Sequence, residues 1–119
     1  MTIRQRLKLA ILEENEQLYN DVAGQLRDAK GTLGRPQENQ LNGLGYRLLF
    51  WGNLPGAVRI FELNVELFPE SFNVYDSYAE GLMYQGDTAA SITNYEKSLE
   101  LNPDNTNAVD MIQKLRGEE

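Results

Sequence analysis

Residues 84–105 read YQGDTAASITNYEKSLELNPDN, and residues 50–71, which lie 34 positions earlier, read FWGNLPGAVRIFELNVELFPES. Both stretches contain a glycine followed by Asn or Asp, an aromatic residue nine positions after that glycine, and a proline near the end. A recurrence at a fixed spacing of this size is typical of repeat architectures. The sequence therefore predicts two contiguous units of equal length, residues 38–71 and 72–105.

Apolar residues within each unit recur three or four positions apart, and period-two alternation is absent. This spacing indicates helices rather than strands. The apolar residues of the first unit are Leu41, Leu44, Leu48, Val58, Phe61 and Val65, and those of the second are Tyr75, Tyr78, Leu82, Ile92, Tyr95 and Leu99. The prediction is an all-α fold with helices near residues 38–51, 54–68, 72–85 and 88–101, of which Leu44, Leu48, Phe61, Tyr78, Leu82 and Tyr95 form the core.

The breaks between these helices have a local cause. Gly52 and Gly86 stand where a left-handed residue ends a helix, and the Asn53 or Asp87 that follows can cap the next helix. Pro55 suits a first turn, and a proline also ends the second helix of each unit, because it cannot continue the hydrogen-bond ladder. The two prolines that end these helices are Pro69 and Pro103.

The flanks of the two units are also predicted to be helical. Residues 106–116 continue the apolar spacing with polar residues between, which is typical of a helix that closes an array with a polar outer face. Residues 3–30 predict a long amphipathic helix, or two joined ones, and residues 1–37 together form an N-terminal helical cap and loop. Leu9 and Leu12 lie off the main apolar stripe of that region, which leaves a dimerising surface as an alternative.

Composition bounds the classes of function. The chain has 119 residues and a formal net charge of −7, which disfavours a nucleic-acid surface. No apolar run approaches the ~20 residues of a membrane span, and nothing at the N-terminus reads as a signal peptide. The expected location is cytoplasmic if the chain is free-standing, and periplasmic if it is a part of a secreted hydrolase.

Catalysis by this chain is not expected. It contains neither cysteine nor histidine, which removes the usual nucleophile–base pairs and the commonest metal ligands. No serine stands in a G-x-S-x-G or S-x-x-K motif, and the glycines of residues 43–45 lack a dinucleotide-binding context. Glu13, Glu14 and Glu16 are interpreted as a solvated helix face. No catalytic residue, metal or cofactor is therefore predicted.

The repeat resembles the tetratricopeptide family. The residues that carry the resemblance are Leu41 and Tyr75, Leu44-Gly45 and Tyr78-Ala79, Ala57 and Ser91, Phe61 and Tyr95, and Pro69 and Pro103. Asn64 departs from the family by standing where a small residue is usual. Residues 61–80, FELNVELFPESFNVYDSYAE, followed by GD and SLELNPDN, also resemble the helical-repeat tail of bacterial serine hydrolases of the esterase and β-lactamase-like kind, a resemblance that covers roughly residues 38–116. An accessory, non-catalytic domain of such an enzyme is therefore the alternative to a free-standing interaction module.

The resemblance implies that the first helix of each unit lines a surface for a protein or peptide partner. The residues it places there are Asn39, Asn42, Tyr46, Leu49, Phe50, Asn73, Asp76, Glu80, Met83 and Tyr84. None is Lys or Arg, which disfavours a clamp for a carboxylate, whereas Asp76 and Glu80 are able to pair with a cation. Leu49 and Phe50 are expected to be covered by the N-terminal helix or by a second protomer, so a homodimer is also considered.

Overall fold

A computed structural model of the protein describes residues 1–117, and over these residues the fold is all-α, with no strand. The elements are α1 (Ile3–Leu12), α2 (Glu16–Asp28), a 3-10 turn η1 (Lys30–Thr32), α3 (Arg35–Phe50), α4 (Leu54–Leu67), α5 (Phe72–Gln85), α6 (Thr88–Leu101) and α7 (Thr106–Leu115). No helix in this part of the chain is both long and apolar enough to cross a bilayer.

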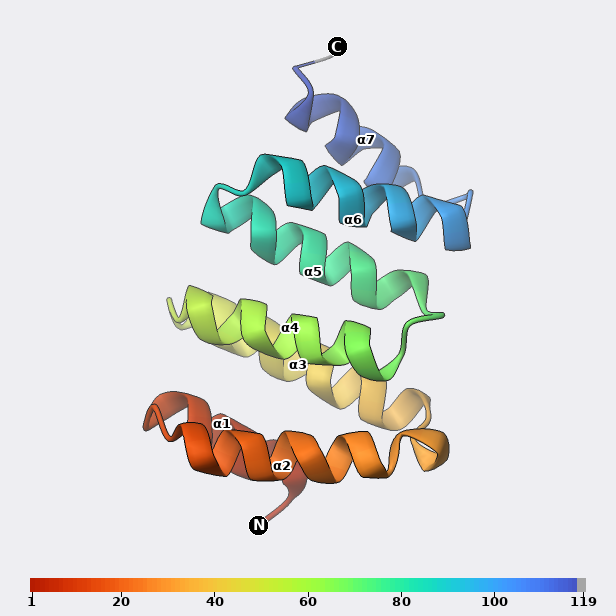
Figure 1. Ribbon diagram of the computed structural model, residues 1–119. Coiled ribbons are helices and arrows are strands. Elements are labelled where there is room, and N and C mark those ends of the chain that lie inside the picture. The colour runs from red at the N-terminus through yellow and green to blue at the C-terminus, as the bar shows by residue number, and fades with distance from the viewer. Residues whose placement is uncertain (118–119) are drawn as a thin grey trace.

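The helices form hairpins that stack in chain order, from α1–α2 at one end to α7 at the other (Figure 1). Each hairpin packs on the next, and α7 packs on α6. The stack is elongated, with extents of 46 × 30 × 18 Å. The predicted helical-hairpin array is therefore confirmed.

The turn inside each of the two predicted units has the expected geometry. Gly52 and Gly86 have φ angles of 82° and 88°, in the left-handed region that glycine enters without strain. Asn53 Oδ1 accepts a hydrogen bond from the Gly56 amide at 3.0 Å, and Asp87 Oδ1 accepts one from Ala90 at 3.1 Å. α4 and α6 end two residues before Pro69 and Pro103, at Leu67 and Leu101.

The N-terminal region differs from the long single helix that was one of the two predictions. The chain turns at Glu13–Asn15, so the second prediction, two joined helices, is nearer to the structure. Glu14 has a φ angle of 53°, and Asn15 Oδ1 caps α2 by accepting from the Leu18 amide at 3.0 Å. α1 packs against α3 and α2 against α4. Residues 3–28 thus form a hairpin stacked like the other two.

The first predicted unit also begins earlier than expected. α3 starts at Arg35 rather than at residue 38, because Pro36 occupies its first turn, where a proline loses no helical hydrogen bond. Its N-terminus is closed by the side chain of Gln37, whose Oε1 accepts a hydrogen bond from the Gly34 amide at 2.8 Å.

The predicted core residues are buried, with one exception. Leu44, Leu48, Phe61, Leu82 and Tyr95 are each at most 6% exposed, whereas Tyr78 is only partly buried and donates a hydrogen bond from its hydroxyl to Glu62 at 2.9 Å. Gly45 lets α3 approach α4 closely, since a Cβ atom at this position would lie 2.3 Å from the Phe61 ring. This close approach explains the glycine of the repeat.

Asn64, the residue that departs from the family pattern, has a role that the repeat itself reveals. Its Nδ2 donates to the Glu38 carbonyl at 3.0 Å, and 34 residues later Ser98 Oγ donates to the Phe72 carbonyl at 2.9 Å. The two side chains therefore tie the second helix of a hairpin to the start of its first helix in the same way. Asn64 Oδ1 is buried without a hydrogen-bond partner.

Ion pairs join the N-terminal hairpin to its neighbour. Arg59 on α4 forms a two-point pair with Glu16 on α2, and its guanidinium lies 3.7 Å from the centre of the Tyr19 ring. Arg27 pairs with Glu66 in the same two-point manner. The hydrogen bond from Arg59 lowers the pKa of Glu16, so this carboxylate is not the merely solvated residue that the sequence indicated.

Candidate partner-binding face

The ten predicted partner-binding residues form five pairs related by the 34-residue repeat, and they lie on α3 and α5, the first helices of successive hairpins. We call this set the first-helix face. The pairs are Asn39 and Asn73, Asn42 and Asp76, Tyr46 and Glu80, Leu49 and Met83, and Phe50 and Tyr84. Side-chain hydrogen bonds between α3 and α5 hold the two helices side by side.

The middle of the first-helix face is a polar network. The Tyr46 hydroxyl donates to Glu80 Oε1 at 2.8 Å. Ser77 Oγ, from the buried side of α5, donates to Asn42 Oδ1 at 2.6 Å. The Tyr46 ring also meets Phe61 edge-on, with ring centres 5.0 Å apart. Three of the predicted residues are therefore brought together here and are held in fixed positions.

Asp76 continues the network to α7. Its carboxylate accepts from Asn105 Nδ2 at 2.8 Å and from Asn107 Nδ2 at 3.2 Å. Neither asparagine was predicted, although Asn107 stands 34 residues after Asn73 and continuing the repeat by one further step would have identified it. α7 is thus not only a cap, because it extends the first-helix face by another helix.

The charged groups of this network are carboxylates, and no Lys or Arg of residues 1–117 pairs with Asp76 or Glu80. Burial raises the pKa of Tyr46 well above its ordinary value, and the hydrogen bond to Glu80 raises it further, so the phenol stays a neutral donor. Burial likewise raises the pKa of Tyr95, with a contribution from Asp76. Within residues 1–117, the ion pairs are made by other carboxylates. The two carboxylates are held by neutral donors.

Two aromatic side chains stand exposed at the C-terminal ends of α3 and α5. Phe50 is 81% exposed and Tyr84 is 56% exposed, whereas Leu49 and Met83 beside them are partly buried. The Phe50 ring centre lies 6.4 Å from that of Tyr46. Of the two expected covers of Phe50, the N-terminal helix is wrong, because it leaves the side chain 81% exposed, and a second protomer stays a prediction.

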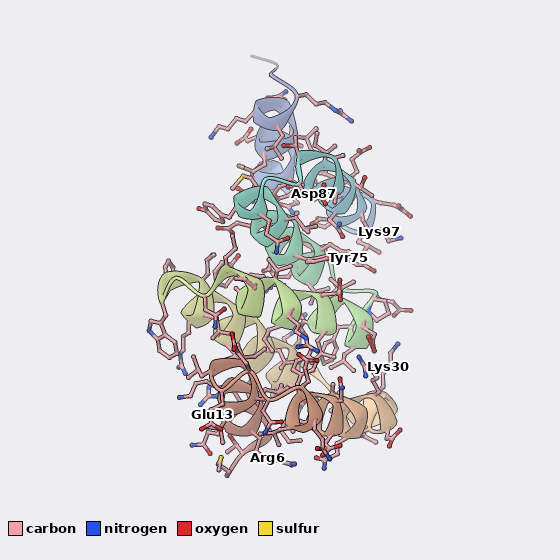
Figure 2. All side chains as sticks on the ribbon, turned by 60° about the vertical axis from the view of Figure 1, so that its left-hand side comes forward. Arg6, Glu13, Lys30, Tyr75, Asp87 and Lys97 are labelled. Carbon is pink, nitrogen blue, oxygen red and sulfur yellow. The ribbon has the colours of Figure 1, made fainter. Side chains whose placement is uncertain are left out.

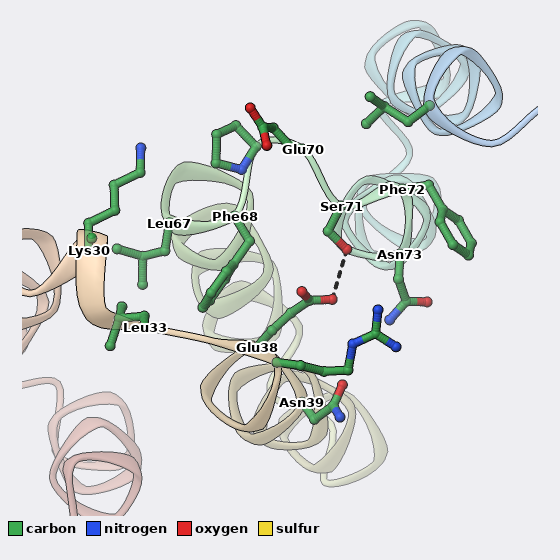
Figure 3. A pocket seen from close by; sticks show the side chains of 14 residues that line it. Lys30, Leu33, Glu38, Asn39, Leu67, Phe68, Glu70, Ser71, Phe72 and Asn73 are labelled. Carbon is green, nitrogen blue, oxygen red and sulfur yellow. Dashed lines mark hydrogen bonds between the residues drawn. The ribbon is translucent and has the colours of Figure 1, made fainter.

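The N-terminal ends of α3 and α5 flank a pocket of about 910 Å³, which Asn39 and Asn73 line (Figure 3). Leu33, Leu67 and Phe68 supply apolar wall, and Ser71 Oγ donates to Glu38 within the pocket at 2.8 Å. Lys30 in the η1 turn and Tyr75 on α5 both lie on the right-hand side of the stack in Figure 2. The sequence did not predict this pocket, because its wall includes the η1 turn, which was interpreted only as the end of a helix.

Several polar groups of the first-helix face are engaged in hydrogen bonds. The Tyr46 hydroxyl is bonded to Glu80, and the Asp76 carboxylate is bonded to Asn105 and Asn107. Among residues 1–117 no cluster of His, Cys, Asp or Glu side chains has the arrangement needed to hold a metal ion. No protein-family model matches the chain, and a search of curated proteins finds no match.

Proposed function

We propose that this protein is a non-catalytic interaction module of the tetratricopeptide kind, and that it binds a protein or peptide partner on the first-helix face. The observation that carries the proposal is the exposure of Phe50 and Tyr84, at 81% and 56%, in equivalent positions of two successive hairpins. Aromatic side chains are enriched in protein–protein interfaces.

The geometry of this pair suits a ligand that touches both rings at once. Packed helices lie roughly 8–10 Å apart. An extended peptide rises about 3.3 Å per residue, so three or four residues bridge that separation. Aromatic side chains supply a large contact area at a low entropic cost, because they have only two rotatable angles. A short segment laid across α3 and α5 therefore meets two rigid anchors.

The rest of the face is pre-organised for binding. Tyr46 and Glu80 are tied together across the two helices, and Asp76 is fixed by Asn105, the N-cap of α7, and by Asn107 in α7. Side chains held in one rotamer before binding lose little entropy when a partner arrives. The same contacts leave these groups engaged with each other, which favours binding over acid–base chemistry.

A selection experiment tests the proposal. Immobilised protein is used to select peptides from a random displayed library, and the amide resonances that shift upon binding are mapped by NMR. We expect the shifts to centre on the ends of α3 and α5, and we expect Phe50→Ser with Tyr84→Ser to weaken binding at least about tenfold, because interface aromatics are common hot spots.

The matched control is Trp51→Ser. Trp51 is 57% exposed at the same end of α3, but it lies outside the first-helix face and is near Lys8, whose Nζ is 5.9 Å from the ring centre. Its replacement should leave the affinity unchanged. Selected peptides that shift only the resonances around the 910 Å³ pocket, or no selected peptide at all, would contradict the proposal. Light scattering at the same concentrations shows whether a second copy of the chain occupies the face instead.

A further inference from the structure

We propose that the partner of the first-helix face is a basic segment, with a Lys or Arg placed against Glu80 and Asp76 and an apolar or aromatic residue placed against Phe50. This inference rests on the proposed function, because it names the chemistry of the partner for that same face. It is carried by three observations: the position of the carboxylates, the absence of cations beside them, and the helix ends on which the aromatic rings stand.

The first observation is that the aromatic anchors and the carboxylates cannot be covered separately. Glu80 precedes Tyr84 by four residues on α5, and Tyr46 precedes Phe50 by four residues on α3. Residues four apart in a helix lie one above the other on the same side. Tyr46 and Glu80 are hydrogen-bonded across the two helices at 2.8 Å. A partner that rests on both exposed rings therefore also excludes water from the Glu80 carboxylate.

The second observation is that nothing in the described chain neutralises these carboxylates. Asp76 and Glu80 are partly buried and receive hydrogen bonds from amides and a phenol, with no Lys or Arg of residues 1–117 within ion-pair distance. Removing the remaining water from an unpaired carboxylate is costly. A neutral or acidic partner would bear that cost, whereas a cation opposite Glu80 offsets it.

The nearest basic residue in sequence does not remove this requirement. Arg47 follows Tyr46 on α3, but its equivalent in the next hairpin is Gly81, where an added Cβ would meet Val58 and Phe61 of α4 at 3.1 Å. Arg47 itself is exposed and lies outside ion-pair distance of Asp76 and Glu80. Lys97 and Arg116 pair with Glu100 and Glu96, which lie outside the first-helix face.

The third observation concerns the helix ends. Phe50 is the last residue of α3, and Tyr84 is the next to last of α5. The C-terminus of a helix carries a partial negative charge from its unpaired carbonyls, which favours a cation nearby. The face of an aromatic ring also attracts a Lys or Arg. Arg47 already stands in the last turn of α3, whereas the last turn of α5 has no basic residue. The end of α5, the rings and the carboxylates thus favour the same sign of charge in the partner.

The peptides selected on the immobilised protein provide the test. Among those that shift the resonances of the first-helix face, we expect Lys and Arg to be enriched and Asp and Glu to be depleted relative to the unselected library. Their affinity should fall as the salt concentration is raised, because charge pairs at an interface are screened. Binding peptides with no basic residue, or with affinity independent of salt, would overturn the inference.

Variants of single carboxylates sharpen the test. Glu80→Gln keeps an oxygen to accept the Tyr46 hydrogen bond but removes the charge. It should therefore weaken the binding of a basic peptide about tenfold and abolish most of the salt dependence of its affinity. Asp21→Asn removes an equal charge from the exposed side of α2 and should change neither the affinity for the peptide nor its salt dependence. If the peptides bind the face but Glu80→Gln has no effect, the basic partner is refuted while the proposed function stands. If no peptide binds, both fail.

Discussion

Three hairpins, α1–α2, α3–α4 and α5–α6, have the same turn geometry but differ in how their cores are filled. In all three the second helix is capped by Asn15, Asn53 or Asp87, and the amide of that cap donates to the carbonyl five residues before it, at 2.8, 2.8 and 3.0 Å. The residue before the cap is left-handed in each case, but it is glutamate in the first hairpin and glycine in the other two.

The interiors of the hairpins differ in the order of large and small residues. When the hairpins are aligned on their turns, Gly45 and Phe61 of the second correspond to Leu7 and Ala23 of the first, and all four are buried. The small residue is on the first helix in one case and on the second helix in the other. A given volume between two helices can be filled from either side, because packing density rather than residue identity is conserved.

The comparison shows that the turn specifies a hairpin while the filling of its core is free to vary. The N-terminal hairpin also contacts its neighbour through charged groups, Arg59 with Glu16 and Arg27 with Glu66, whereas the contacts between α3 and α5 run through Tyr46 and Ser77. Hairpins of one architecture can therefore be joined by different chemistry.

The largest expected effect is the loss of the large residue in the second hairpin. Phe61→Ala should lower the free energy of unfolding by about 3–5 kcal/mol, because it empties the space between α3 and α4. Leu7→Ala, the corresponding large residue of the first hairpin, should cost about 2–5 kcal/mol for the same reason. Urea unfolding followed by circular dichroism measures both. A Phe61→Ala protein that unfolds like the wild type would show that the aligned cores are not equivalent.

The close approach at Gly45 gives the next largest effect. Gly45→Ala should destabilise the fold by about 1–3 kcal/mol, since the new Cβ would lie 2.3 Å from the Phe61 ring and the core would be overpacked. Gly43→Ala, in the same helix, has no atom within 4 Å of the added Cβ, and it should stabilise the helix by about 0.5–1 kcal/mol. Changes of opposite sign in the free energy of unfolding, for two identical substitutions two residues apart, would confirm the packing argument. Equal signs would refute it.

Alkaline pH tests the buried phenols of the two regions. Burial, together with the hydrogen bond to Glu62, raises the pKa of Tyr78 from 10.0 to about 12. The fold favours the neutral phenol, so this stabilisation is complete below pH 10 and is lost as the pH rises towards 12. Unfolding free energies measured from pH 9 to pH 12 should fall, and Tyr78→Phe should reduce the slope.

Tyr19 of the first hairpin is the comparison for that experiment. Burial raises its pKa as well, but the nearby Arg59 and Arg27 oppose the shift. Tyr19→Phe should therefore alter the pH dependence less than Tyr78→Phe does. A larger change for Tyr19 would mean that the arginines of α2 and α4 do not stabilise its ionised form.

The smallest expected effects belong to the turns. Glu14→Gly should stabilise the protein by up to about 1 kcal/mol, because glycine accepts the left-handed conformation that costs other residues energy. Gly52→Ala should destabilise it by about 1 kcal/mol, since its φ angle is 82°. Thermal unfolding measures whether each variant is more or less stable than the wild type. Stabilisation by Gly52→Ala would contradict the shared geometry of the turns.

The comparison also explains what the sequence could predict. The helices of residues 35–101 were predicted within three residues because Gly52, Asn53, Gly86 and Asp87 combine the signals of a turn at one fixed spacing. The N-terminal hairpin was not identified as such, since its turn stands 38 residues before the next one and contains Glu14 instead of glycine. A left-handed glutamate has no strong sequence signal, because only the surrounding structure imposes the conformation.

Part of the candidate site could likewise be predicted from the sequence, and part of it could not. The residues of the first-helix face were expected from the resemblance to the tetratricopeptide family, and they lie as equivalent pairs on α3 and α5. Their partners Ser77, Asn105 and Asn107 were missed, because a hydrogen bond between two helices depends on how closely the helices pack. The exposure of Phe50 depends likewise on the course of α1, which the turn at Glu13 determines.

The core contains two clusters of buried apolar residues, and this division bears on how the molecule opens. One cluster spans α1 to α4, while the other consists of Ala79, Tyr95, Ala108 and Ile112 on α5, α6 and α7. Contacts between neighbouring hairpins make opening local rather than global. Amide hydrogens of α7 and α6 should exchange with deuterium as one group and faster than those of α3 and α4, so the C-terminal third would loosen and close again while the N-terminal hairpins stay folded.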